Sequence, residues 1–176
     1  MLSLNRKTDY ALVALAHLAR QADAAAPATS ARAIAEAYGL PRAMLANLLK
    51  QLHRAGLIDS ARGTSGGYSL ARPAGRITLA EVIAAIEERP VQVALCCQDG
   101  GADDEAGEEC LACRIERLCP ISGAIQALNA DFAAILEGVT LQHLLDQTVH
   151  QAIAGAVDPQ AHGAGESHNV LTSGAD

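Results

Sequence analysis

"AIAEAYGLPRAMLANLLKQLHRAGLIDSARGTSGGYSLAR" occupies residues 33–72, and its first half predicts a pair of short helices. Ser30 can cap a helix over residues 31–38, and Gly39 can end it. Pro41 suits the first turn of a second helix that runs to about Ala55. The inner face of this second helix is a set of leucines at helical spacing, namely Leu45, Leu48, Leu49 and Leu52. Two short helices joined by a tight, glycine-containing turn predict a helix-turn-helix.

The second half of the same stretch predicts a β-hairpin. Leu57 and Ile58 are typical of one strand, and residues 68–70 are typical of another. The segment "RGTSGG" at 62–67 lies between them and has the glycine content of a hairpin turn. A hairpin placed directly after a helix-turn-helix is a wing, so the stretch as a whole predicts a winged helix-turn-helix.

Helices are predicted on both sides of this unit. Residues 8–20 predict a helix that is buried on more than one side, with Leu12, Leu15 and Ala19 on one face. Further along, Thr78 can open a helix through a Thr-x-x-Glu capping box with Glu81. The predicted core therefore includes helices from outside the helix-turn-helix.

The C-terminal half predicts a long helix that starts at Pro120, runs to about Glu137 and is closed by Gly138. Its broad apolar face comprises Ile121, Ile125, Leu128, Phe132, Ile135 and Leu136. A last helix is expected to start at Thr140. The predicted fold class is mainly α with a small β wing, a winged helix-turn-helix followed by a long C-terminal dimerisation helix.

These patterns divide the chain into five regions. The winged helix-turn-helix takes residues 1–76, and a connecting helix with a strand or loop takes 77–95. A cysteine-rich loop occupies 96–119, and the long helix and the last helix occupy 120–154. Residues 155–176 are dominated by Gly, Ala, Ser, His and Asp, which predicts a disordered tail.

The charge is distributed unevenly along the 176 residues. Residues 1–76 carry ten Lys or Arg against four Asp or Glu, whereas residues 77–176 carry three against sixteen, within a net charge of −7. A basic N-terminal half can face a polyanion, although an ordinary solvated surface is the alternative. The sequence shows no signal peptide and no apolar run near the roughly 18 residues that span a bilayer, so we expect a cytoplasmic protein without membrane contact.

The winged helix-turn-helix gives the first set of candidate site residues, because such a helix fits the major groove of DNA and a wing can follow phosphates or enter the minor groove. The candidates are Arg42, Ala43, Ala46 and Asn47 in the second helix, and Arg62, Thr64 and Ser65 in the wing. Arg62 is the strongest base-contacting candidate. The alternative is a winged-helix module that makes only protein contacts.

The cysteines give the second set, since all five lie between Cys96 and Cys119. Thiols that cluster in a reducing compartment are typical of metal or redox sites. Three thiolates with a fourth ligand could hold an iron-sulfur cluster, four could hold zinc, and two could form a regulatory disulfide. Cys110 and Cys113 form a zinc-like pair, but the remaining spacings are not those of a zinc ribbon. Spacing alone leaves cluster and zinc open, with a thiol switch as the third possibility.

A family resemblance adds to these patterns. From residue 1 to about 145 the chain resembles the dimeric winged-helix transcriptional regulators of the IscR and NsrR type. The matching stretches are "TDYAL" at 8–12, "AIAEAYGLPRAML" at 33–45, "AGLIDSARGTSGGYSLARPAGRITLAEVIAAIE" at 55–87 and "LEGVTLQHLL" at 136–145. "CRIERLCPI" at 113–121 further resembles the branch that regulates SUF-type iron-sulfur cluster assembly. The resemblance implies a homodimer that binds an operator in double-stranded DNA and senses redox, nitric oxide or iron-sulfur status through a 2Fe-2S or 4Fe-4S cluster, with 2Fe-2S favoured.

Transferred position by position, the resemblance implies Cys96, Cys113 and Cys119 as cluster ligands, with Cys97 and Cys110 in reserve. In the IscR branch a His three residues after the last cysteine completes the site, and this chain has Ser122 there. The nitric-oxide sensor instead uses an Asp from the first helix of the partner subunit, which corresponds to Asp9. An all-cysteine site is an alternative, and a helix-capping role is the alternative for Asp9.

Function classes other than a cluster-sensing regulator are less consistent with the sequence. A cysteine-dependent enzyme needs a base beside its nucleophile, and no cysteine-enzyme signature accompanies these thiols, so we predict no enzymatic activity. The principal rival is a cluster-free regulator on the same fold that uses thiols or zinc. Iron-sulfur assembly genes are the expected targets by resemblance alone.

Overall fold

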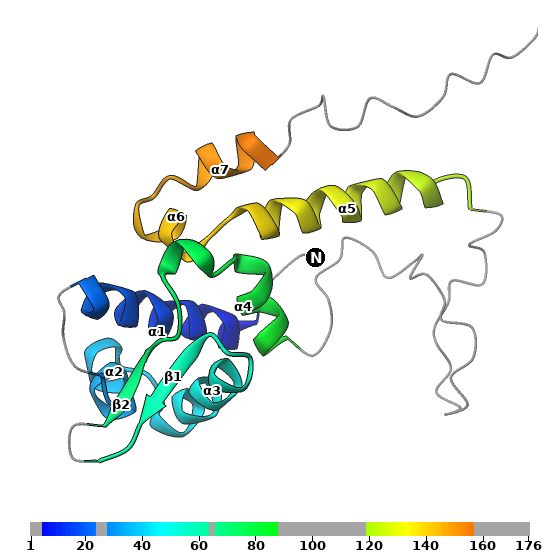
Figure 1. Cartoon of the computed structure of the whole chain (residues 1–176). Helices are drawn as coiled ribbons and strands as arrows, with labels where there is room; N and C mark the ends of the chain where they lie inside the picture. Colours follow the sequence, from blue (N-terminus) through cyan, green and yellow to red (C-terminus); the bar gives the residue numbers. More distant parts are fainter. Residues whose placement is uncertain (1–4, 24–27, 64–65, 88–118, 157–176) are drawn as a thin grey trace, which may run out of the picture.

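A computed structural model describes residues 5–23, 28–63, 66–87 and 119–156. The described elements are, in chain order, α1 (Arg6–Asp23), α2 (Ala31–Tyr38), α3 (Arg42–Arg54), β1 (Ile58–Ala61), β2 (Gly67–Leu70), the short 3-10 helix η1 (Ala74–Arg76), α4 (Leu79–Ile86), α5 (Ser122–Gly138), α6 (Leu141–Leu145) and α7 (Val149–Ala156). Figure 1 shows α2, α3 and the hairpin on one side of α1, with α5, α6 and α7 on the other. This arrangement confirms the predicted mainly helical fold with a two-stranded antiparallel wing.

The helix-turn-helix forms through the local interactions that its sequence predicts. The Ser30 hydroxyl accepts a hydrogen bond from the Ala33 N–H at 3.1 Å and so caps α2. Gly39 ends α2 in the left-handed conformation, with φ of +64°, which a side chain would strain. Pro41 precedes α3 as its cap residue instead of lying inside the first turn. The bounds of α2 are those predicted, and α3 ends one residue earlier than expected.

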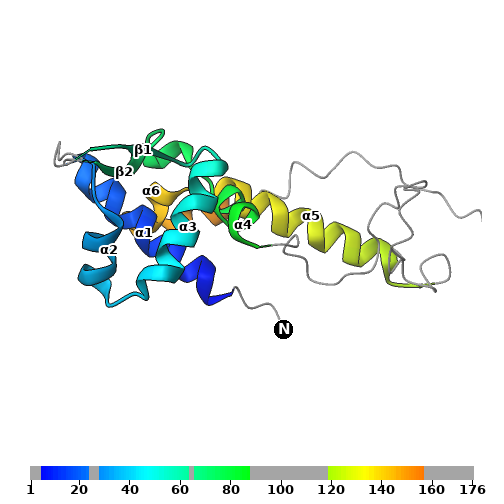
Figure 2. The same cartoon turned by 90° about the horizontal axis from the view of Figure 1, so that it is seen from below.

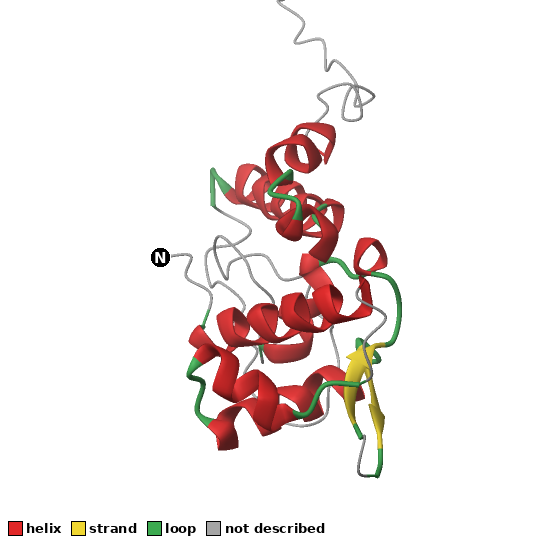
Figure 3. Cartoon of the chain, turned by 90° about the vertical axis from the view of Figure 1, so that its left-hand side faces the viewer, coloured by secondary structure: helices red, strands yellow, loops and turns green. Residues whose placement is uncertain are grey.

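The wing is a four-residue antiparallel pair in which Ile58 faces Leu70 and Ala61 faces Gly67. The first strand therefore starts one residue later than predicted and extends further into the hairpin. A third segment joins the pair, because Thr29 and Tyr68 exchange backbone hydrogen bonds of 2.9 and 2.8 Å. This bridge ties the second strand of the wing to the residues that precede α2. The two strands appear in yellow in Figure 3, projecting beside the helices.

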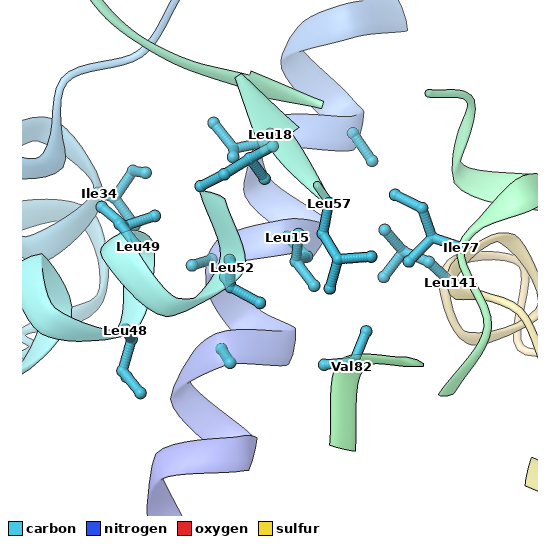
Figure 4. Packing of buried hydrophobic residues seen from close by; sticks show 14 of the residues in the cluster. Leu15, Leu18, Ile34, Leu48, Leu49, Leu52, Leu57, Ile77, Val82 and Leu141 are labelled. Carbon is cyan, nitrogen blue, oxygen red and sulfur yellow. The ribbon is translucent and has the colours of Figure 1, made fainter. Parts of the chain in front are cut away.

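The core lies where α1 crosses α3 and the start of the wing. Leu15 and Leu18 of α1 pack in the same cluster as the predicted leucines of α3, all of which are buried. Figure 4 shows this packing and its continuation to Leu57, Val82, Ile77 and Leu141. The buried face of α1 differs from the predicted one, because it includes Ala11 and Ala14 while Leu12 is only half-buried. Alanines there allow α1 to approach its neighbours closely.

The C-terminal helices depart from the predicted boundaries. The long helix begins at Ser122, and Pro120 lies in the preceding turn, where the Ser122 N–H donates to the Cys119 carbonyl at 3.3 Å. The predicted last helix is two helices, because Gln147 adopts a φ of +57° between α6 and α7 and breaks the helical course. Thr140 caps α6, as its predicted position at the helix start implies.

Backbone pairing anchors this C-terminal part to the winged module. The Leu79 N–H donates to the Val139 carbonyl at 2.7 Å, and the Leu141 N–H donates to the Ile77 carbonyl at 2.8 Å. Val139 and Leu141 are both buried. α5 itself has no buried residue, and Figure 2 shows it extending away from the winged module. No helix in the described ranges has the length and apolar character required to cross a membrane.

Candidate nucleic-acid interface

The outer face of α3 is the first component of the site. Ala43, Asn47, Lys50 and Arg54 are all exposed and recur at spacings of four, three and four residues. Those spacings place them on one face of a helix, opposite the buried leucines. Two of these positions, Ala43 and Asn47, were predicted. Lys50 and Arg54 were missed, although their helical spacing from Asn47 was a signal that could have identified them.

Arg42, at the start of α3, is part of an ion-pair cluster with α2. One carboxylate oxygen of Glu36 accepts hydrogen bonds from Arg42 Nη2 and from Arg32 Nε, each at 2.8 Å. The hydrogen bond and charge of Arg32 hold the pKa of Glu36 below its ordinary value, and Arg42 adds to the effect. The side chains of Arg42 and Arg32 remain 65 and 72% exposed. Two arginines and one glutamate leave one net positive charge at the N-terminus of α3.

A groove runs along the flank of α3 that faces the first turn of α1, and we name it the α3 groove. Its volume is about 410 Å³. Lys7 lines it from α1, and the side chains that line it from α3 include Met44, Asn47, Lys50, Gln51 and Arg54. Three of the lining side chains are cationic, and none is acidic.

The wing presents Arg62 directly after β1, where its side chain is exposed. Gly63 has a φ of +114°, a backbone conformation that favours glycine because a side chain would be strained there. The Gly66 N–H donates a hydrogen bond to the Gly63 carbonyl at 3.0 Å. The other two wing candidates, Thr64 and Ser65, lie outside the described residues. In Figure 1, α3 and the wing lie on the same side of the molecule, away from α5.

The first turn of α1 is held by the last described residue before the cysteine-rich region. Glu87 Oε1 accepts hydrogen bonds from the Asn5 N–H at 3.0 Å and from the buried Thr8 hydroxyl at 2.5 Å. Asn5, whose side chain accepts from the Lys7 N–H at 3.3 Å, occupies the cap position of α1. Asp9 lies inside the first turn and is exposed, so the capping role considered for it is wrong.

Of the cysteines predicted as cluster ligands, the structure describes Cys119 alone. It is half-buried, forms no disulfide within the described residues, and lies directly before Pro120 at the start of the turn that leads into α5. Cys96, Cys97, Cys110 and Cys113 lie outside the described residues, as do most of the predicted 96–119 loop and residues 157–176 of the predicted tail. A thiol and a carboxylate are both ligands that iron accepts, so the chemistry of Cys119 and Asp9 suits the predicted site.

Comparison with protein families shows which family the chain belongs to. Residues 4–147 match the Rrf2 model, described as an iron-dependent transcriptional regulator. The chain belongs to the Rrf2 family. It is accordingly a DNA-binding transcriptional regulator of the winged helix-turn-helix type and not an enzyme, which confirms those predictions.

Curated relatives align over nearly the same span as the Rrf2 match. Protein aau3 of Rhizobium meliloti is 33% identical over 143 residues, covering 81% of this chain and 84% of its own. NMA1593 of Neisseria meningitidis, described as an HTH-type transcriptional regulator, is 35% identical over 144 residues, covering 82% of this chain and 88% of its own.

Solved structures agree with the Rrf2 fold. T. potens IscR aligns with a TM-score of 0.58 at 24% identity, covering 84% of this chain and 88% of its own, and supports the fold alone. CymR, the global cysteine regulator of B. subtilis, aligns with a TM-score of 0.55 at 26% identity, covering 84% and 98%. Staphylococcus aureus CymR in its oxidised form aligns with a TM-score of 0.52 at 27% identity, covering 81% and 95%.

Proposed function

We propose that this Rrf2 protein is a homodimeric regulator that binds operator DNA through α3 and the wing and senses redox, nitric oxide or iron-sulfur status through an iron-sulfur cluster. The proposal rests on two features that occur together in this chain: an exposed, basic surface on α3, and five cysteines that all lie in one segment. The first feature would bind the DNA, and the second would hold the group that senses the signal.

The DNA-binding half of the proposal places α3 in the major groove. A helix about 10–12 Å across fits a groove about 12 Å wide, and the residues near its N-terminus reach base edges. Arg42, Ala43 and Asn47 are the proposed contacts from α3, and Arg62, Thr64 and Ser65 are those from the wing. Pro41 provides no side-chain cap, so the first N–H groups of α3 remain available to a phosphate.

The homodimer is supported by the uncovered apolar surface of α5. Leu128 of α5 is 47% exposed and Ile121, its cap residue, is 58% exposed, while Ile125, Phe132 and Ile135 of α5 are only partly buried. A helix of 17 residues with an apolar face and no buried residue needs another surface to cover it. We propose that α5 packs against its symmetry mate and so sets the spacing of two α3 helices, which must be about 34 Å to read successive turns of DNA.

The sensor half assigns Cys96, Cys113 and Cys119 as cluster ligands, with Asp9 of the partner subunit as the fourth ligand and Cys97 and Cys110 in reserve. A 2Fe-2S cluster is favoured over 4Fe-4S, and the cluster would supply a redox-sensitive group that oxygen or nitric oxide can destroy. The acidic segment 96–119 is polar and rich in like charges, so bound metal would contribute free energy towards ordering it. The family description as iron-dependent supports this assignment.

The proposed targets are iron-sulfur assembly genes, by resemblance of "CRIERLCPI" to the SUF-regulating branch. The alternative is a cluster-free regulator that uses a thiol switch or zinc. One observation favours it as the second candidate: the structural relatives include CymR proteins, one of them described in an oxidised form.

A spectrum of anaerobically purified protein tests the proposal, combined with iron and sulfide analysis and with DNA binding before and after exposure to air. Stoichiometric iron and sulfide, with visible absorbance that bleaches as the affinity for DNA changes, is the expected result. A colourless protein that contains zinc or no metal after attempted reconstitution would transfer the assignment to the thiol or zinc alternative. Replacing Cys113 and Cys119 by Ser should abolish the absorbance, and unchanged regulation in that variant would refute the coupling.

A further inference from the structure

We propose that the α3 groove is a phosphate-binding track that grips the DNA backbone beside the major groove, independently of base sequence. The inference deepens the proposed function and rests on it, because it takes α3 to be the helix that enters DNA. It adds Lys7, Lys50 and Arg54 to the binding surface as residues that position the protein on the duplex without reading bases.

The charge of the groove identifies its occupant. Lys7, Lys50 and Arg54 supply three positive charges, and the remaining lining consists of apolar side chains and the amides of Asn47 and Gln51. Within the described ranges, none of these three cations takes part in an ion pair, unlike Arg32 and Arg42 a few residues away. Cations gathered without a carboxylate repel one another unless an anion lies between them. DNA supplies phosphates at regular intervals along each edge of its major groove.

The position of Lys7 argues against a purely structural role. Lys7 is the second residue of α1 and directly follows Arg6 in its first turn. The positive end of a helix dipole disfavours cations there, so this placement costs stability instead of adding to it. A cation that is unfavourable for its own helix, yet lines a groove with two others, is consistent with selection for an anionic partner.

The groove also adjoins the proposed base-reading surface. Asn47 belongs both to the outer face of α3 and to the lining of the groove, so the two surfaces are continuous. Figure 2 shows the start of α1 close beside α3, and Lys7 lines the groove together with residues of α3. A helix seated in the major groove has a phosphate strand along its flank, and this is the place where the groove lies.

The salt dependence of binding separates phosphate binding from base reading. Each neutralised phosphate contributes about −0.9 to the slope of log K against log salt on B-DNA, so removing one such cation from each half of a dimer should make the slope shallower by about 1.8. We would compare Lys7→Gln, Lys50→Gln and Arg54→Gln with the wild-type protein. The probes are a mixed-sequence duplex and an operator selected from random DNA by the wild-type protein.

The matched control is Arg76→Gln. Arg76 is an exposed arginine in η1, and η1 contacts α6, on the side of the protein away from α3. The expected result is that each groove variant flattens the slope on both duplexes, keeps the ratio of operator to mixed-sequence affinity, and retains the wild-type circular dichroism and melting temperature. Arg76→Gln should retain the wild-type slope.

Three outcomes would overturn the inference while leaving the proposed function intact. The first is a wild-type slope in all three groove variants with operator binding preserved. The second is a reduction in affinity confined to the operator, which would make the groove a base-reading surface. The third is a change in dimer association with no change in slope, which would make the groove a protein interface. By contrast, a wild-type protein that does not prefer any selected duplex would refute the proposed function itself.

Discussion

Replacement of Gly67 should show how much the wing contributes to folding stability and to operator binding. A Cβ atom added at Gly67 would lie 2.5 Å from the carbonyl carbon of Thr29 and 2.6 Å from its oxygen. Both distances are far below van der Waals contact, and the opposing atoms are backbone, which cannot rotate away. Gly67→Ala should therefore force β2 away from the segment that precedes α2.

The magnitude follows from the bonds that this movement breaks. Thr29 and Tyr68 exchange hydrogen bonds of 2.9 and 2.8 Å. At about 1 kcal/mol each, their removal reduces the free energy of unfolding by about 2 kcal/mol. For a chain of this size that corresponds to a melting temperature lower by about 4–8 °C. If the displaced wing also fails to reach a base, operator affinity should fall about tenfold or more, since a good base interaction is worth about 1–3 kcal/mol.

Thermal unfolding followed by circular dichroism and operator binding followed by fluorescence anisotropy measure the two effects. Gly123→Ala is the matched control, because a Cβ atom at Gly123 meets nothing within 4 Å and alanine suits a helix. The control should melt at or slightly above the wild-type temperature and bind normally. If Gly67→Ala behaves like Gly123→Ala in both assays, the account of the wing as a strand pair clamped by Thr29 is wrong.

Three further predictions address other parts of the fold. Thr78→Ala removes the hydroxyl that accepts a hydrogen bond from the Glu81 N–H at 3.2 Å. It should lower the free energy of unfolding, measured by chemical denaturation, by about 1 kcal/mol. An unchanged free energy of unfolding would contradict the capping role of Thr78. Leu128→Glu changes a side chain that is 47% exposed, so it should lower the free energy of unfolding of the monomer by less than about 0.5 kcal/mol. The dimer should nevertheless dissociate, as measured by sedimentation velocity, and a persistent dimer would exclude α5 as the interface. Because the folded pKa of Glu36 is lowered, chiefly by Arg32, its stabilising contribution is complete above the unfolded pKa of about 4.3 and disappears as the pH falls through the lower folded value. Glu36→Gln should therefore flatten the acid limb of the stability curve, and identical acid limbs in the two proteins would contradict the Arg32–Glu36–Arg42 cluster.

Local interactions explain why much of the fold could be predicted. The Ser30 cap, the Gly39 stop and the Thr78–Glu81 capping box each involve residues within three or four positions of one another, so the chemistry is visible in the sequence. The same applies to the leucine face of α3, whose spacing alone identifies the buried side. The candidates Ala43 and Asn47 were predicted from their place near the N-terminus of that helix.

Features that depend on distant segments were not predictable in this way. The split between α6 and α7 occurs at Gln147, a residue that carries no helix-stop signal. The buried alanines of α1 gave no hydrophobic signal comparable to that of Leu12. The α3 groove needs Lys7 from α1 opposite Lys50 and Arg54 from α3, and this juxtaposition arises only when the helices pack.

The order and type of the elements around the helix-turn-helix follow from the amino-acid sequence, because caps, turns and periodicity act over a few residues. The partner of each surface follows from the packing of the elements against one another. Gly67 illustrates the difference: in the sequence it is one of several turn glycines, but in the fold it is the point where β2 meets the backbone of Thr29. That approach joins residues 38 positions apart, and its closeness is set by the packing of the whole module.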